Sequence, residues 1–180
     1  MTEMICAGFG GQGVLTTGML LINAGMKQGK HVLFYPSYGS EMRGGTANCT
    51  VKISDKKIPS PMIRAADIVF TMNSPAVDKF ESRLKPGGLL LVNSTLVDEN
   101  RKYRDDIRVI KVPVTDIASE IGNPRGANIA MMGVLAVATD LFDPEFLLEQ
   151  INSYFEAKGK KVPANETCFR KGMQEGKAQL

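Results

Sequence analysis

Apolar and polar residues follow one another along the chain in two rhythms, one typical of strands and one typical of helices. Short apolar runs such as Met4–Ala7 indicate buried strands, and residues 46–54 alternate as a half-buried strand does. These runs predict strands at residues 4–7, 31–35, 46–54, 68–72, 89–92 and 107–112. Helical spacing predicts helices at residues 12–27, from a cap at Ser74 to before Pro86, and at 115–121, 127–142, 144–157 and 165–174.

Strands alternating with helices, followed by helices alone from Thr115 onward, predict a three-layer, Rossmann-like α/β fold. The polar turn Asp55-Lys56-Lys57 follows the strand predicted at residues 46–54 and indicates a hairpin into Ile58. The sheet is therefore expected to be mostly parallel with one hairpin strand. We expect a single domain over residues 1–180, with an α/β core at 1–142 and a helical C-terminal extension at 143–180.

Glycines inside two of the predicted helices point to close packing. Gly18 and Gly25 share a stripe with Val14 and Leu21, and each costs about 1 kcal/mol relative to alanine in a helix interior. Close contact with the sheet or a neighbouring helix is the expected compensation. Small residues around Gly133 likewise allow two helices to approach, either in an ordinary core or at a subunit interface.

Composition excludes several classes of protein. The chain is 43% apolar and 23% charged, which is ordinary for a globular domain, and no run of 18 apolar residues predicts a membrane span. A net charge of +3 is too small to indicate nucleic-acid binding. Cys6, Cys49 and Cys168 are scattered and His31 is the only histidine, so we expect a reduced, cytoplasmic protein without a metal or cluster site.

A glycine loop directly after the first strand is the main candidate for chemistry. Gly8, Gly10 and Gly13 fit the spacing G-x-G-x-x-G, and Gly11 and Gln12 lie between them. Glycines let backbone N–H groups approach a phosphate or another chain closely. The sequence therefore predicts a ligand or partner contact here, although a tight strand–helix crossing would have the same pattern.

The rest of a dinucleotide signature is missing. The second strand should end in an acidic residue that holds a ribose hydroxyl, but it runs into Pro36 instead. The first acid afterwards is Glu41, and Arg43 beside it could meet a 2′-phosphate. NAD is therefore disfavoured, while an NADP-dependent oxidoreductase and a non-catalytic nucleotide-binding regulatory module stay open as alternatives.

Residues 35–46 form a second candidate segment, because they follow the second strand and are expected at the same sheet edge as the glycine loop. The segment combines an aromatic ring, hydroxyls, a carboxylate, a guanidinium and glycines within ten residues. The plain interpretation is a solvated connection with an internal acid–base pair. The functional interpretation is a contact surface made by Ser37, Tyr38, Glu41, Arg43 and Gly44.

Several motifs in order carry a specific resemblance. They are G-x-G-G-Q-G-V at 8–14, S-Y-G-S-E-M-R-G-G-T-A-N-C at 37–49, A-D-I-V at 66–69, M-N at 72–73 and K-P-G-G at 85–88. Over residues 3–140 the chain resembles the γ subunit of 2-oxoacid:ferredoxin oxidoreductases, and the 2-oxoglutarate and branched-chain types more than the pyruvate type. Ser40 departs from the family pattern, in which many relatives carry proline.

The resemblance implies a multi-subunit enzyme that oxidatively decarboxylates a 2-oxoacid, foremost 2-oxoglutarate, makes an acyl-CoA and reduces ferredoxin. Thiamine diphosphate, magnesium, iron–sulfur clusters and CoA would lie on or between partner subunits, within complexes that could pair as a homodimer. This chain would shape the active-site cleft without a catalytic residue of its own, with Asn73 among its contacts. Isolated, it is expected to be inactive.

Overall fold

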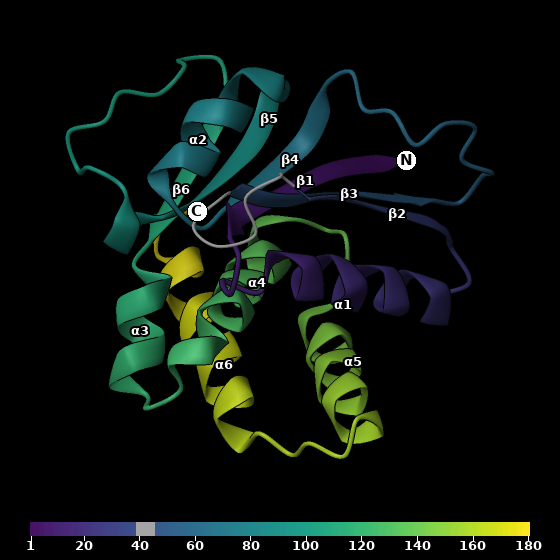
Figure 1. Ribbon diagram of the computed structural model, residues 1–180, viewed down its shortest axis with the longest axis vertical. Helices are drawn as coiled ribbons and strands as arrows, with labels where there is room; N and C mark the ends of the chain where they lie inside the picture. The colour runs from purple at the N-terminus through teal and green to yellow at the C-terminus, as the bar shows by residue number, and fades with distance from the viewer. Residues whose placement is uncertain (39–45) are drawn as a thin grey trace.

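The computed structural model describes residues 1–38 and 46–180, which fold around one six-stranded sheet of order β2-β3-β1-β4-β5-β6 (Figure 1). β1, β4, β5 and β6 are parallel, while β3 runs antiparallel to both of its neighbours, β1 and β2. The expected mostly parallel α/β sheet is confirmed. The strands are β1 (Thr2–Phe9), β2 (His31–Tyr38), β3 (Thr46–Ser54), β4 (Ala66–Thr71), β5 (Leu84–Asn93) and β6 (Arg108–Val112).

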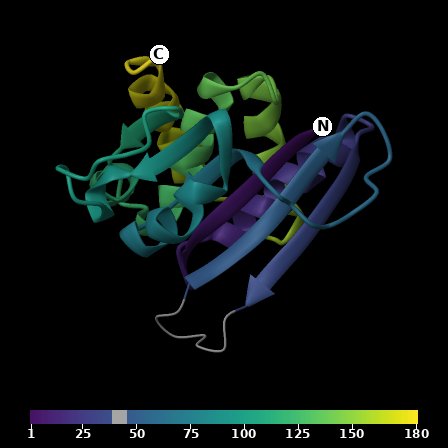
Figure 2. The ribbon, with the colours of Figure 1, turned by 90° about the horizontal axis from the view of Figure 1, so that it is seen from above.

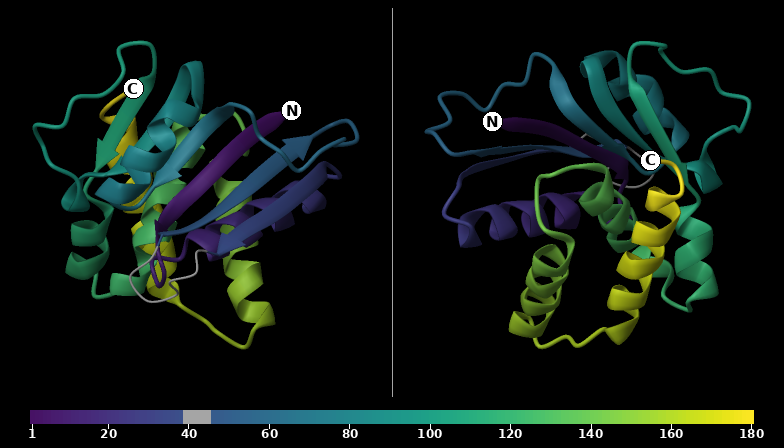
Figure 3. Two further views of the ribbon diagram at one scale, coloured as in Figure 1. Left: turned by 45° about the horizontal axis from the view of Figure 1, so that its top comes forward. Right: turned by 180° about the vertical axis from the view of Figure 1, so that it is seen from behind.

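Helices cover the two faces of this sheet unequally. One face packs on α1 and on α3 to α6, and the other packs on α2 and the connections around it (Figures 1 and 3). No helix in the described ranges has both the length and the apolar character needed to cross a membrane. The helices are α1 (Val14–Lys27), α2 (Ser74–Phe80), α3 (Val114–Glu120), α4 (Ala127–Ala138), α5 (Pro144–Ala157) and α6 (Pro163–Lys177), with 3-10 turns η1 (Glu81–Arg83), η2 (Ser94–Leu96) and η3 (Pro124–Gly126).

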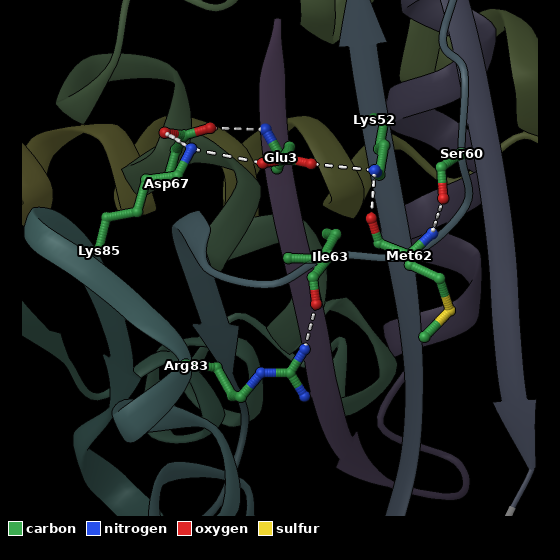
Figure 4. Close-up of polar contacts among 8 residues, drawn as sticks. All are labelled: Glu3, Lys52, Ser60, Met62, Ile63, Asp67, Arg83 and Lys85. Carbon is green, nitrogen blue, oxygen red and sulfur yellow. Dashed lines mark hydrogen bonds and ion pairs between the residues drawn. The ribbon is translucent and has the colours of Figure 1, made fainter.

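The antiparallel strand is not where the polar turn after Ser54 predicted it. Residues 55–65 form no strand, so the expected hairpin into Ile58 is wrong. β3 instead pairs with β2 from Ala47 to Ser54 (Figure 2). The connection crosses the sheet face opposite α1, where Lys52 and Arg83 donate hydrogen bonds to the carbonyls of Met62 and Ile63 (Figure 4). The chain can then enter β4 beside β1 as a parallel strand.

Two element boundaries differ from the apolar pattern for local reasons. β2 continues through Pro36 to Tyr38, which is tolerated because β2 is the edge of the sheet and proline there removes no shared ladder bond. β5 begins at Leu84 rather than Leu89, because Leu84 pairs with Ala66 before a register shift.

The glycines of α1 are packing residues, as their stripe predicts. A Cβ on Gly18 would lie 2.6 Å from Phe34 Cε2 and 2.7 Å from Cys49 Sγ, and a Cβ on Gly25 would lie 2.7 Å from Val32 Cγ1. Real Cβ atoms do not approach other heavy atoms this closely. The missing side chains therefore let α1 lie directly on β2 and β3.

Gly18→Leu is expected to lower the free energy of unfolding by about 1–3 kcal/mol, because four added carbons overpack the helix–sheet contact. Urea unfolding of the purified chain measures this loss. Met26→Leu, at a 52% exposed position of the same helix, is the matched control and should leave stability unchanged. An unchanged midpoint for Gly18→Leu would show that the assigned helix face is wrong.

α4 is a core helix, and its small residues contact α6 of the same chain. Every residue of α4 except Val137 is buried. A Cβ on Gly133 would lie 2.9 Å from the carbonyl carbon of Phe169, and one on Gly172 would lie 2.7 Å from that of Ala130. The core-helix interpretation is thus confirmed, and a subunit interface on the Gly133 face is excluded because α6 occupies it.

Candidate functional site

The carboxyl ends of β1, β4 and β5 meet at one edge of the sheet, where the glycine loop (residues 10–13) joins β1 to α1. Gly11 and Gly13 have φ angles of 91° and 75°, a backbone region that favours glycine. Gly8 is buried at the end of β1, where a Cβ would lie 2.8 Å from Gln12 Oε1. Gly10 and Gly11 are exposed. The end of β1 is therefore packed at Gly8, and the loop presents its backbone to solvent at Gly10 and Gly11.

Gln12 is held by hydrogen bonds within the chain. Its Oε1 accepts from the Phe9 N–H at 2.7 Å and from Asn73 Nδ2 at 2.8 Å. Its Nε2 donates to the Met72 carbonyl at 3.2 Å. The side chain therefore fixes the glycine loop against the end of β4, and its expected contact with a ligand or partner stays a prediction.

Asn73 connects the glycine loop to α2. Its Oδ1 accepts from the Ala76 N–H at 2.9 Å and so caps the helix, while its Nδ2 donates to Gln12. The expected cap at Ser74 is wrong by one position, since Ser74 is already the first helical residue. Asn73 is only 1% exposed. Its observed role is to orient, and a role in binding stays a prediction.

Two further buried asparagines extend this polar row along the edge. Asn93, at the end of β5, donates to the Met72 carbonyl at 3.0 Å and to Thr115 Oγ1 at 2.8 Å. Asn128, in the first turn of α4, donates to the Gly13 carbonyl at 3.2 Å and to Thr17 Oγ1 at 3.3 Å. Neither was expected at the site. Only Asn93, which follows the apolar run of β5, had a usable signal in the sequence.

The second candidate segment flanks the same edge. Tyr38 pairs with Ala47, and Ala47 pairs with Gly8, so the ends of β2, β3 and β1 lie side by side. Ser37 is exposed on β2. The expected placement on the glycine-loop edge is confirmed for these flanking residues. Glu41, Arg43 and Gly44 lie outside the described residues.

The position of β3 weighs against a dinucleotide site. In the dinucleotide-binding fold the second strand lies beside the first, so that its terminal acid reaches the ribose of a ligand on the glycine loop. Here β3 separates β2 from β1, and β2 ends in Tyr38. The NADP-dependent alternative therefore lacks both the residue and the strand order that it needs.

The cysteines of the sheet belong to the core. Cys6 and Cys49 oppose each other across β1 and β3, and both are fully buried. A hydrogen bond with Cys49, together with burial, raises the pKa of the Cys6 thiol well above its ordinary value. Across residues 1–38 and 46–180, no three His, Cys, Asp or Glu side chains are grouped so that they could hold a metal ion.

Gln12→Ala is expected to lower the free energy of unfolding by about 1–3 kcal/mol, because the buried Asn73 amide and the Phe9 N–H lose their partner. Asn73→Ala should cost a similar amount. The double variant should cost less than the sum, with a coupling of about 0.5–3 kcal/mol in urea unfolding. Gln28→Ala, at an exposed position, is the control. Strict additivity would contradict the proposed link between loop and helix cap.

A mostly parallel α/β sheet with helices on both faces and a glycine loop at its carboxyl edge defines the class of this protein. The family model described as pyruvate ferredoxin/flavodoxin oxidoreductase matches residues 3–175. The chain belongs to this family, as its motifs predict.

Curated relatives and solved structures agree with this membership. The chain is 37% identical over 175 residues to a ketoisovalerate oxidoreductase subunit VorA of Methanothermobacter marburgensis, covering 97% of this chain and 36% of that one. It is 36% identical over 151 residues to a 2-oxoglutarate synthase subunit KorC of Methanocaldococcus jannaschii, covering 83% and 81%. The chain thus spans about a third of the VorA relative and most of the KorC relative.

The γ subunit of a keto/oxoacid ferredoxin oxidoreductase from Geobacter sulfurreducens PCA has the same fold. The two chains superpose with a TM-score of 0.83 at 28% identity, over 99% of each. The likeness therefore includes the C-terminal helices α5 and α6 as well as the sheet.

Proposed function

We propose that this chain is the γ subunit of a 2-oxoacid:ferredoxin oxidoreductase, an enzyme that oxidatively decarboxylates a 2-oxoacid to an acyl-CoA and reduces ferredoxin. The family match across residues 3–175 carries this proposal. The fold shared with a γ subunit over 99% of both chains supports it. The proposed partners are the other subunits of the complex, and electrons reach ferredoxin through those subunits. Two such complexes pair as a homodimer, and the enzyme is located in the cytoplasm.

The role of this chain is to shape the active-site cleft with the carboxyl edge of its sheet. The amide row from Asn128 to Asn93 holds that edge rigid, and Gly10 and Gly11 leave loop backbone exposed beside it. A rigid, preorganised surface loses little entropy on docking. Neighbouring subunits or a cofactor phosphate are the proposed contacts of the glycine loop. Ser37 and Tyr38 are proposed to contribute to the same contact, and the buried Asn73 supports the loop from behind.

The proposed substrate is 2-oxoglutarate, with branched-chain 2-oxoacids as the alternative. The names of relatives include both a 2-oxoglutarate synthase subunit and a ketoisovalerate oxidoreductase subunit. The KorC relative is matched over most of its own length, which favours 2-oxoglutarate. Assaying the assembled enzyme with each acid separately distinguishes the two.

The cofactors of the reaction are proposed to lie on or between the partner subunits: thiamine diphosphate, magnesium, iron–sulfur clusters and CoA. Thiamine diphosphate supplies the carbanion chemistry of decarboxylation and the clusters carry the electrons. No bond-making step is assigned to a residue of this chain. The proposed contribution of this chain is to position the neighbouring subunits at the active-site cleft and to exclude water from the cleft.

Arg43→Lys is expected to impair ferredoxin reduction by the assembled enzyme several-fold while leaving the fold of this chain intact. A guanidinium grips a carboxylate or phosphate through two parallel hydrogen bonds that an ammonium cannot copy. Arg64→Lys, at an exposed position in the connection before β4, is the control. Wild-type assembly and activity in Arg43→Ala would make residues 39–45 an ordinary solvated connection.

Co-purification tests the proposed function. A tagged chain should capture, from co-expression with the chains encoded by neighbouring genes, subunits with thiamine-diphosphate and ferredoxin motifs in fixed stoichiometry. A chain that purifies alone from such a mixture would contradict the subunit assignment. Titration of the isolated chain with NADP and ATP tests the alternatives directly.

A further inference from the structure

A glutamine side chain after α6 occupies part of one edge of the sheet. β6 is the last strand of the described sheet, so the side of β6 away from β5 has no strand beside it. Figures 1 and 3 show the end of α6 next to β6. There Gln179 Oε1 accepts from the Lys111 N–H at 2.9 Å, and Gln179 Nε2 donates to the Lys111 carbonyl. The side-chain amide therefore makes both hydrogen bonds that a neighbouring strand would make with Lys111.

This contact is weak enough to be exchanged for another. Gln179 and Lys111 are both exposed, so water competes for their hydrogen bonds. An intramolecular hydrogen bond contributes little net stability, and holding a long side chain in one rotamer costs conformational entropy. A strand pairing along the edge of β6 can therefore displace the glutamine amide.

The edge offers more backbone than Gln179 covers. The N–H and C=O groups of successive strand residues point to opposite sides of the strand, so Val109 faces the same side of β6 as Lys111. Unpaired groups at a sheet edge are a template for the addition of another strand. An extended segment would pair with Val109 and Lys111 together, whereas Gln179 reaches only Lys111.

The exposed side chains of β6 carry one sign of charge. Arg108 and Lys111 are exposed, and β6 contains no acidic residue. Within residues 1–38 and 46–180, neither of these cations forms an ion pair. Asp106, just before the strand, is paired with Arg104 at 2.6 Å. Opposite charges stabilise neighbouring strands and like charges destabilise them. An acidic strand therefore suits this edge, and a second copy of β6 does not.

We propose that the edge of β6 is a docking site for an extended, acidic segment of a partner protein, which displaces Gln179 and adds a strand to the sheet. Main-chain hydrogen bonds supply the affinity in this mode of recognition, and side chains supply the selectivity. Arg108 and Lys111 lie on opposite faces of the strand because they are three residues apart. The segment should therefore carry acidic residues with the same spacing. This docking goes beyond the proposed subunit role and does not depend on it.

Amide NMR of the isotopically labelled full chain tests the proposal with the synthetic peptide T-E-V-T-E-V-T, blocked at both ends. The amide signals of Val109 and Lys111 should shift saturably as the peptide is added. Gln179→Ala should bind the peptide about threefold more tightly or better, because the peptide no longer competes with the glutamine amide. Gln174→Ala removes an exposed glutamine of α6 and is the matched control, with unchanged affinity.

Charge reversal tests the proposed selectivity. Lys111→Glu should weaken binding of T-E-V-T-E-V-T several-fold and should favour T-K-V-T-K-V-T instead, because the charges across the strands are then reversed. Thermal melting of each variant verifies that the chain is folded. If the wild-type chain bound both peptides equally well, the acidic character of the partner would be refuted.

Two further results would overturn the proposal. If the Val109 and Lys111 signals of Gln179→Ala did not shift saturably, Gln179 would only close the edge. If Gln179→Ala instead dimerised through these residues as its concentration rose, the occupant would be a second copy of this chain. Assembly with the partner subunits is measured separately. A chain that assembles but binds no peptide would refute only this docking, and a chain that binds the peptide but does not assemble would refute only the proposed function.

Discussion

Gly172→Ala is expected to lower the free energy of unfolding by about 3 kcal/mol or more, the largest effect expected of a single added methyl group at the glycines that the structure describes. A Cβ at this position would overlap the carbonyl oxygen of Ala130 and lie 2.7 Å from its carbonyl carbon. Backbone atoms cannot rotate away as a side chain can, so α6 would have to separate from α4. Small-to-large changes in a packed core usually cost 1–3 kcal/mol, and this contact is with backbone.

Alanine substitutions at three glycines of the α4–α6 contact should destabilise the chain to different extents. Gly133→Ala should be nearly as damaging, since its Cβ would lie 2.9 Å from the carbonyl carbon of Phe169. Gly176→Ala should cost less, because its nearest neighbour is the movable side chain of Val137 at 3.0 Å. Urea unfolding followed by circular dichroism gives all three values. A Gly172→Ala midpoint equal to wild type, or the reverse order, would contradict the α4–α6 contact.

Lys52→Met is expected to cost about 3–5 kcal/mol. The Lys52 side chain is 3% exposed, and its Nζ lies 2.9 Å from Glu3 Oε1 and 2.6 Å from the Met62 carbonyl oxygen (Figure 4). Removing one partner of a buried ion pair leaves the other charge uncompensated. Lys85 also contacts Glu3, but at 3.4 Å and with 41% of its side chain exposed, so it compensates only in part.

The double variant Glu3→Gln with Lys52→Met distinguishes the loss of the ion pair from the change in side-chain packing at position 52. It should be more stable than Lys52→Met alone, because no unpaired charge stays buried. Asp55→Asn breaks the ion pair of Asp55 with Lys30, in which Asp55 is 79% exposed, and should change stability by less than about 1 kcal/mol. Equal stability of Lys52→Met and wild type would show that the connection over the sheet is not held by this lysine.

Local patterns predicted the elements well where the deciding interactions are local. Residues 46–54 and 144–157 were expected with the bounds that β3 and α5 have. Alternation along β3 places Cys49, Val51 and Ile53 in the core beside α1, although Lys52 and Ser54 on the other face are buried as well. Pro144 in the first turn of α5, after the Asp143 cap, is a start signal contained in the sequence itself.

Pairings between distant segments were not predictable in the same way. The insertion of β3 between β1 and β2 depends on register with both neighbours, and the polar turn at 55–57 pointed to a hairpin that does not form. Gln12, a polar residue in a glycine loop, is typical of a ligand contact. In the fold its side chain instead bonds to Asn73, which lies 61 residues away in the sequence. The glycine motif located the sheet edge correctly. Which residues stabilise the loop and which are exposed to a partner depends on the fold and could not be predicted from the motif.

Adding the chain back to its partner subunits and measuring ferredoxin reduction tests whether it is a subunit of the enzyme. The purified chain alone should be colourless and should turn over no 2-oxoacid. The partners without it should be impaired, and its addition should restore reduction that requires both 2-oxoglutarate and CoA. Full activity of the partners without this chain, or 2-oxoacid turnover by the chain alone, would contradict its proposed role as the γ subunit.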